Sequence, residues 1–115
     1  MTKTSTGPSG IGFMQRLRFA PVRVSAGLRR KGGEAARDLA ARIDALLGSL
    51  PERAAAGVPT EADWGPRPFH GRMIRVTPGL LREMKEWLLL MELHRMISER
   101  LEADPEWADL RGLLW

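Results

Sequence analysis

Residues 77–103 constrain the fold more than any other part of the chain, because they combine helix signals at both ends with helical periodicity between them. Thr77 suits the N-cap, and Pro78 suits the first helical position, where its missing N–H would have no partner. At 1.5 Å per residue this helix is about 40 Å long. Its apolar residues form two stripes, Leu80/Met84/Trp87/Leu88/Met91 and Leu90/Leu93/Ile97/Leu101. Around residues 87–91 the helix is apolar on every side, which predicts burial all round.

Two further helices flank this segment in the sequence. Residues 34–50 repeat apolar side chains at helical spacing, and Pro51 ends the pattern. Asp104, Pro105 and Glu106 repeat the cap, proline and acid order of a helix start, and they open a short helix that contains Trp107 and Leu110. We therefore predict an all-α fold over residues 34–115, a small helical body with two main helices and a short C-terminal helix.

Residues 1–33 differ from the rest of the chain in charge. They hold seven of the 18 lysines and arginines and none of the 14 acids, although the whole chain has a net charge of +4. Pro21 argues against one helix through this stretch, and Leu17/Phe19 and Val22/Val24 alternate with arginines as in a strand. Ile11, Met14 and Leu17 instead fit a short helical stripe. The two patterns together predict an extended or partly helical basic N-terminal arm that takes its conformation from what it docks on, which is an acidic protein groove, a nucleic-acid backbone or a membrane surface.

Residues 51–79 form a proline- and glycine-rich segment between the two main predicted helices. A helical turn fits residues 51–57, but the remainder predicts irregular backbone. Connections longer than about 12–15 residues are uncommon in compact domains and are usually functional. Because the segment also carries large apolar side chains such as Trp64 and Phe69, we interpret it as a docking segment that lies on a protein surface.

The residues that carry chemistry do not gather into a recognisable motif. The chain has no cysteine and no tyrosine, and its two histidines, His70 and His94, lack metal-ligand spacing. No serine stands in a G-x-S-x-G elbow, and the glycines of residues 7–12 lack the ending of a P-loop. We therefore expect no catalytic residue, metal site, cofactor or small-molecule ligand. The chain is still compatible with being a small subunit of a multi-subunit enzyme.

The longest apolar run spans five residues, 87–91, whereas a membrane-spanning helix needs about 20. This predicts a soluble, cytoplasmic protein. An organellar matrix is the alternative location, because the arginine-rich, acid-free first 33 residues share the composition of transit segments.

The apolar side chains exceed what three helices of this size are expected to cover, and such a surplus is typical of obligate interfaces. We therefore predict a non-catalytic accessory or structural subunit that wraps over and stabilises a larger protein in a multi-subunit complex. The alternative is a nucleic-acid-binding component, such as a ribonucleoprotein or genome-packaging subunit, whose basic arm contacts phosphates. The expected partner-binding residues are Arg16, Arg18, Phe19, Arg29, Arg30, Trp64, Phe69, Trp87, Leu90, Trp107 and Trp115.

Overall fold

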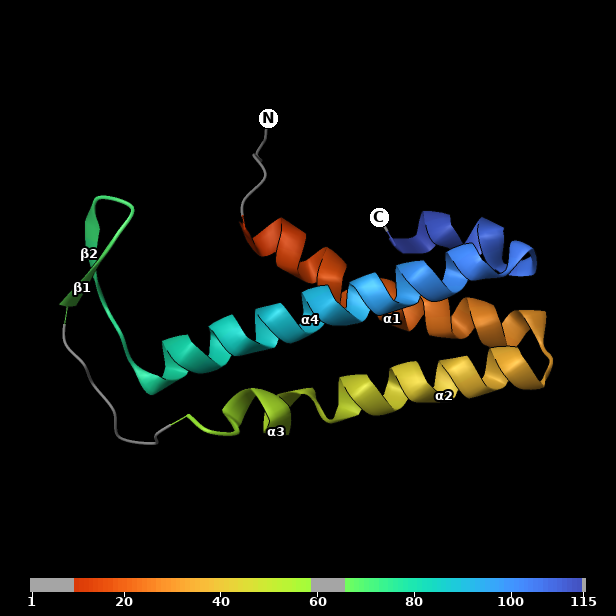
Figure 1. Cartoon of the computed structure of the whole chain (residues 1–115), viewed down its shortest axis with the longest axis horizontal. Helices are drawn as coiled ribbons and strands as arrows, with labels where there is room; N and C mark the ends of the chain where they lie inside the picture. The colour runs from red at the N-terminus through yellow and green to blue at the C-terminus, as the bar shows by residue number, and fades with distance from the viewer. Residues whose placement is uncertain (1–9, 59–65, 115) are drawn as a thin grey trace, which may run out of the picture. The chain divides into compact units, whose positions relative to one another are not determined.

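The computed structural model describes residues 10–58 and 66–114, and most of them are helical, which confirms the all-α prediction (Figure 1). The described residues form four α-helices, one 3₁₀-helix and one β-hairpin. The order is α1 (Gly10–Lys31), α2 (Glu34–Gly48), α3 (Leu50–Ala55), β1 (Pro66–Phe69), β2 (Arg72–Arg75), α4 (Pro78–Ala103) and the 3₁₀-helix η1 (Pro105–Leu114). None of the helices in these described ranges combines the length and apolarity that crossing a membrane requires.

The described residues divide into two compact units, which are treated separately below. The body unit comprises residues 10–48 and 90–114, and therefore contains α1, α2, the second half of α4 and η1. The hairpin unit comprises residues 49–58 and 66–89, and contains α3, both strands and the first half of α4.

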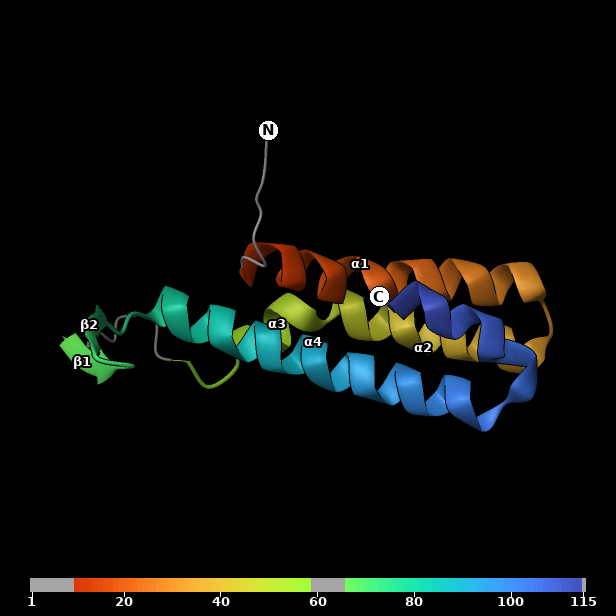
Figure 2. The same cartoon turned by 90° about the horizontal axis from the view of Figure 1, so that it is seen from above.

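In the body unit, α1 and α2 run antiparallel, with the C-terminal half of α4 beside them (Figures 1 and 2). The largest fully buried side chains of this core include Leu28 of α1, Ile43 of α2 and Ile97 of α4. η1 contributes Trp107, Leu110 and Leu114 to the same cluster. Each element thus buries one apolar stripe against the others, as amphipathic helices of a small domain must.

The reversal between α1 and α2 depends on two glycines. Gly32 and Gly33 have φ values of 76° and 94°, a backbone region that side chains with a Cβ rarely occupy. The Gly32 N–H donates to the Leu28 carbonyl at 3.2 Å and ends α1, and the Gly33 carbonyl accepts from the Arg37 N–H at 3.1 Å in the first turn of α2. This is the glycine C-terminus common to α-helices.

Residues 10–31 form α1, which continues through Pro21, so the expectation of a helix break at this proline is wrong. A proline inside a helix removes one hydrogen bond and costs about 3 kcal/mol. Pro21 is also among the fully buried side chains, beside Leu17, Ala20 and Val24 on the inner side of α1. Burial of the ring in this stripe offsets its cost to the helix. Residues 1–9 of the expected arm lie outside the described ranges.

α4 begins where the sequence predicts. The Thr77 hydroxyl accepts a hydrogen bond from the Leu80 N–H at 3.1 Å, which is the expected N-cap, and Pro78 is the first helical residue. The stripe Leu90, Leu93, Ile97 and Leu101 is buried, as expected. The expectation that residues 87–91 are buried on every side is wrong, however, because Leu88 is 64% exposed and Met91 is exposed as well.

The hairpin unit corrects the expectation of irregular backbone over residues 51–79. The helical turn expected at residues 51–57 is present as α3, and residues 66–75 form an antiparallel hairpin that pairs Pro66 with Arg75 and Phe69 with Arg72. Its two-residue turn places His70 and Gly71 at φ values of 50° and 78°. Two positive φ values in succession fit the turn that matches the twist of paired strands.

Candidate protein-binding surface

α1 has an inner side and an outer side with different chemistry. Leu17, Val24 and Leu28 of the inner side are buried in the body-unit core. Successive residues of an α-helix are separated by about 100° around its axis, so Phe19, Val22 and Ala26 share the opposite side. Phe19 is 54% exposed and Val22 is 52% exposed. An apolar strip therefore runs along the solvent-facing side of a helix whose other side is fully covered.

Arginines border this strip on both sides. By the same helical spacing, Arg18 and Arg29 lie along one edge, and Arg23 and Arg30 lie along the other, with Arg16 extending the second edge. All five are exposed. We call this set the outer face of α1, and it consists of Arg16, Arg18, Phe19, Val22, Arg23, Ala26, Arg29 and Arg30.

Part of the positive charge of α1 is engaged by acids of the body unit. Arg29 forms an ion pair with Asp44 of α2. The second carboxylate oxygen of Asp44 accepts a hydrogen bond from the buried Ser25 hydroxyl at 2.8 Å. A buried hydroxyl without a partner would be costly, so this contact fixes the pairing of α1 with α2 as well as neutralising charge.

The last turn of α1 is tied to η1 in a similar way. The Lys31 amine lies 2.9 Å from a carboxylate oxygen of Asp109. This hydrogen bond from Lys31 holds the pKa of the Asp109 carboxyl below its ordinary value. The ion pair is exposed and weak, but together with Arg29 it reduces the charge that residues 29–31 offer to an external anion.

The expected partner-binding residues fall into three groups in the structure. Arg16, Arg18, Phe19, Arg29 and Arg30 lie together on the outer face of α1. Leu90 is buried and Trp107 is 7% exposed, so both belong to the interior and present no side chain to a partner in this conformation.

The other expected aromatic anchors lie either in the hairpin unit or outside the described residues. Trp87 is half-buried on α4, and Phe69 lies in β1. Both belong to the hairpin unit, whereas the outer face of α1 belongs to the body unit. Trp64 and Trp115 lie outside the described residues. Within the body unit, the structure therefore brings together the basic residues and Phe19 on one face of α1.

Five exposed large apolar residues of the described ranges were not named by the sequence interpretation of binding: Val22, Met73, Met84, Leu88 and Met91. Val22 completes the strip on α1, and Leu88 is exposed between Met84 and Met91 on α4. The signal for Val22 was its helical spacing of three residues from Phe19, which the alternating pattern of residues 17–24 concealed. The outer face of α1 differs from the α4 stripe because arginines border it on both sides.

Within residues 10–58 and 66–114, no three histidine, aspartate or glutamate side chains gather closely enough to hold a metal ion. No protein-family model, curated protein or solved structure matches the chain.

Proposed function

We propose that the protein is a non-catalytic accessory subunit that binds a larger protein through the outer face of α1. The observation that carries this proposal is the half-exposed pair Phe19 and Val22 at the centre of a face bordered by arginines. Protein interfaces commonly have an apolar centre and a polar rim, and they are enriched in aromatic residues and arginine. The spacing of residues 19, 22 and 26 is that of a helix seated in a groove.

The chemistry of this face defines the partner that fits it. An apolar groove would cover Phe19 and Val22, and carboxylates at its rim would pair with guanidinium groups such as Arg23 and Arg30. Arginine forms planar, paired hydrogen bonds with carboxylates, which adds orientation to attraction. Because α1 is already packed against α2 and η1, its binding would require little ordering of the backbone.

The nucleic-acid alternative finds less support on the same face. Phosphate backbones are bound by several unpaired cations in sequence, and the binding weakens steeply with salt. Here Arg29 and Lys31 are paired with acids, and the centre of the face is apolar. A protein groove uses both the arginines and the strip, whereas a phosphate backbone uses the arginines alone.

The test is capture of binding partners by the immobilised full chain from extracts of cells that naturally produce it. Phe19→Ser with Val22→Ser removes the apolar strip, and Met84→Ser with Leu88→Ser is the matched control on α4. We expect one protein partner to remain bound after a high-salt wash and to be retained at least tenfold less by the α1 variant. The few residues that dominate the binding energy of an interface lie near its centre and each cost about 2 kcal/mol or more when truncated. The control variant should retain the partner fully.

Two outcomes would contradict the proposal. One is retention of nucleic acid that is lost with salt and is unaffected by the α1 variant, which would support the alternative function. The other is equal partner loss in the α1 and α4 variants. Circular dichroism of both variants checks folding, because exposed substitutions should change the free energy of unfolding by about 0.5 kcal/mol or less.

A further inference from the structure

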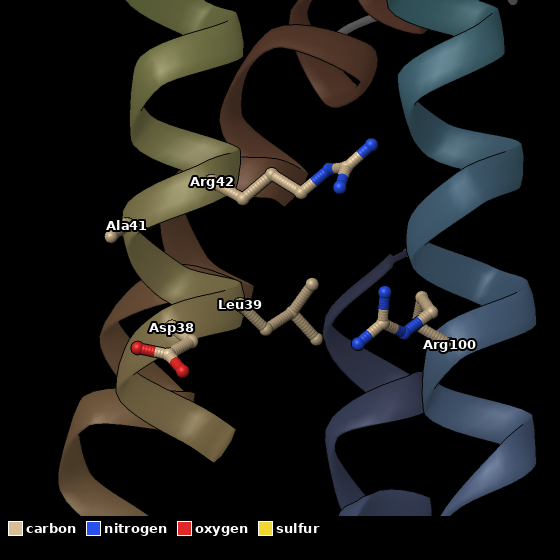
Figure 3. A pocket seen from close by; sticks show the side chains of 5 residues that line it. All are labelled: Asp38, Leu39, Ala41, Arg42 and Arg100. Carbon is tan, nitrogen blue, oxygen red and sulfur yellow. The ribbon is translucent and has the colours of Figure 1, made fainter. Parts of the chain in front are cut away.

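The body unit contains a pocket that is separate from the outer face of α1. Its volume is about 460 Å³, and it opens between α2 and the C-terminal half of α4 (Figure 3). The lining residues are Asp38, Leu39, Ala41 and Arg42 of α2 and Arg100 of α4. Small-molecule sites in proteins commonly have volumes of roughly 300–1,000 Å³.

Two guanidinium groups extend into this space from opposite helices. Figure 3 shows Arg42 reaching from α2 towards α4, and Arg100 reaching from α4 towards α2. The carboxylate of Asp38 points away from both of them (Figure 3). Neither arginine forms a hydrogen bond or an ion pair with another residue of the described ranges. The pocket therefore holds two guanidinium groups and one carboxylate, and no ion pair joins that carboxylate to either arginine.

The other charged contacts of the body unit show what is different here. Arg29 pairs with Asp44, Lys31 pairs with Asp109, and Arg111 lies 3.5 Å from Glu102. These cations each have an acid beside them, whereas two like charges converge at the pocket. Like charges repel, and an anion placed between them would replace the repulsion with two attractions.

We propose that this pocket binds a phosphate monoester. Guanidinium groups match the geometry of a phosphate, and a phosphate with two negative charges balances Arg42 and Arg100 together. The pocket also has room for a small organic group beside the phosphate. Such a site departs from the sequence-based expectation of no small-molecule ligand. It is independent of the proposed protein-binding function, since it uses none of the α1 residues.

Isothermal titration calorimetry of the full chain with phenyl phosphate tests the proposal at pH 8 and constant ionic strength. At this pH the phosphate group is a dianion, because its second pKa is about 6. We expect saturable binding with one ligand per chain, tighter than that of inorganic phosphate and of benzoate. Arg42→Gln and Arg100→Gln should each weaken binding at least tenfold. Arg95→Gln is the matched control, an exposed arginine of α4 that does not line the pocket, and should change the affinity less than twofold.

Absence of saturable binding by the wild-type chain would overturn the proposal, as would an equal loss in Arg95→Gln, which would indicate general attraction to a basic protein. Equal affinities for phenyl phosphate and inorganic phosphate would overturn the placement of an organic group in the pocket beside the phosphate. Amide chemical-shift changes in the wild-type chain give a measurement that needs no variant. They should centre on residues 38–42 and 100, and shifts confined to α1 would contradict the placement.

Discussion

The two units of the molecule differ in how many of their apolar side chains they bury. The body unit buries a continuous cluster drawn from α1, α2, α4 and η1. Among the side chains described in the hairpin unit, the fully buried apolar ones are Leu50 and Ala54 of α3. Met73 of β2 is 66% exposed, and Met84 and Leu88 of α4 are exposed too. The body unit therefore has a core that can stabilise it, whereas the hairpin unit has little core of its own.

The difference has a physical basis in how each element obtains its stability. A two-stranded hairpin is at best marginally stable by itself, because it cannot bury enough apolar surface. Inside its unit, a hydrogen bond from the Lys85 amine to the Ala56 carbonyl joins α4 to the end of α3. Such an exposed polar contact adds little stability compared with a buried side chain. We therefore expect most of the free energy of unfolding to arise in the body unit.

Truncation of core residues should give the largest effect and tests this comparison directly. Leu28→Ala and Ile97→Ala remove fully buried side chains of the body unit and should each lower the free energy of unfolding by about 2–5 kcal/mol. Met73→Ala in the hairpin unit should change it by about 0.5 kcal/mol or less, because the side chain is largely exposed. Urea unfolding of the full chain measures all three. Similar losses in both units would contradict the division.

A substitution at Gly27 tests how closely η1 packs against α1 in the body unit. A Cβ at Gly27 of α1 would lie 2.7 Å from Cδ2 of Leu110 and 3.3 Å from Cδ1 of Leu113, so η1 packs against α1 at a position that requires a small residue. Gly27→Val should therefore cost about 1–3 kcal/mol through overpacking. Gly112→Val is the control, because nothing lies within 4 Å of a Cβ there. Equal melting temperatures of Gly27→Val and the wild type would show that η1 does not pack closely at Gly27.

The smallest effect concerns the ion pair that joins α1 to η1. Because Lys31 lowers the pKa of Asp109 in the folded chain, the ionised carboxylate favours folding. This contribution is present at neutral pH and is lost as the pH falls below the ordinary pKa of 3.8 and through the lower folded value. Asp109→Asn should therefore have a slightly lower melting temperature than the wild type at pH 7, and the difference should shrink at about pH 3. A constant difference over this range would contradict the assigned ion pair.

Helix signals that are local in sequence were sufficient to predict α2, α4 and η1, but not α1. Thr77 and Pro78 mark the start of α4, and the acid and proline of residues 104–105 mark the start of η1, where the Asp104 carboxylate accepts from the Glu106 N–H at 3.0 Å. These signals act through neighbouring backbone groups and need no tertiary contact. The all-α class follows from them.

The features that were missed depend on tertiary packing. Pro21 argues against a helix by local rules, but burial of its ring in the body-unit core permits one. The position of Leu90 inside the core could not be predicted, because a helix with two apolar stripes does not show which one the rest of the domain covers. Of the residues on the outer face of α1, the sequence interpretation named Arg16, Arg18, Phe19, Arg29 and Arg30 and omitted Val22, Arg23 and Ala26.

Site-specific photo-crosslinking tests directly whether the outer face of α1 contacts a protein partner. A p-benzoylphenylalanine is placed at Phe19 in one full-length protein and at Met84 in another, and each is irradiated in cells that naturally produce the chain. Both positions are exposed apolar residues on helices, so the probe itself disturbs them similarly. We expect position 19 to crosslink to one protein partner and position 84 to give no crosslink to that partner. Crosslinks from position 19 to nucleic acid, or to no molecule at all, would contradict the docking role of α1.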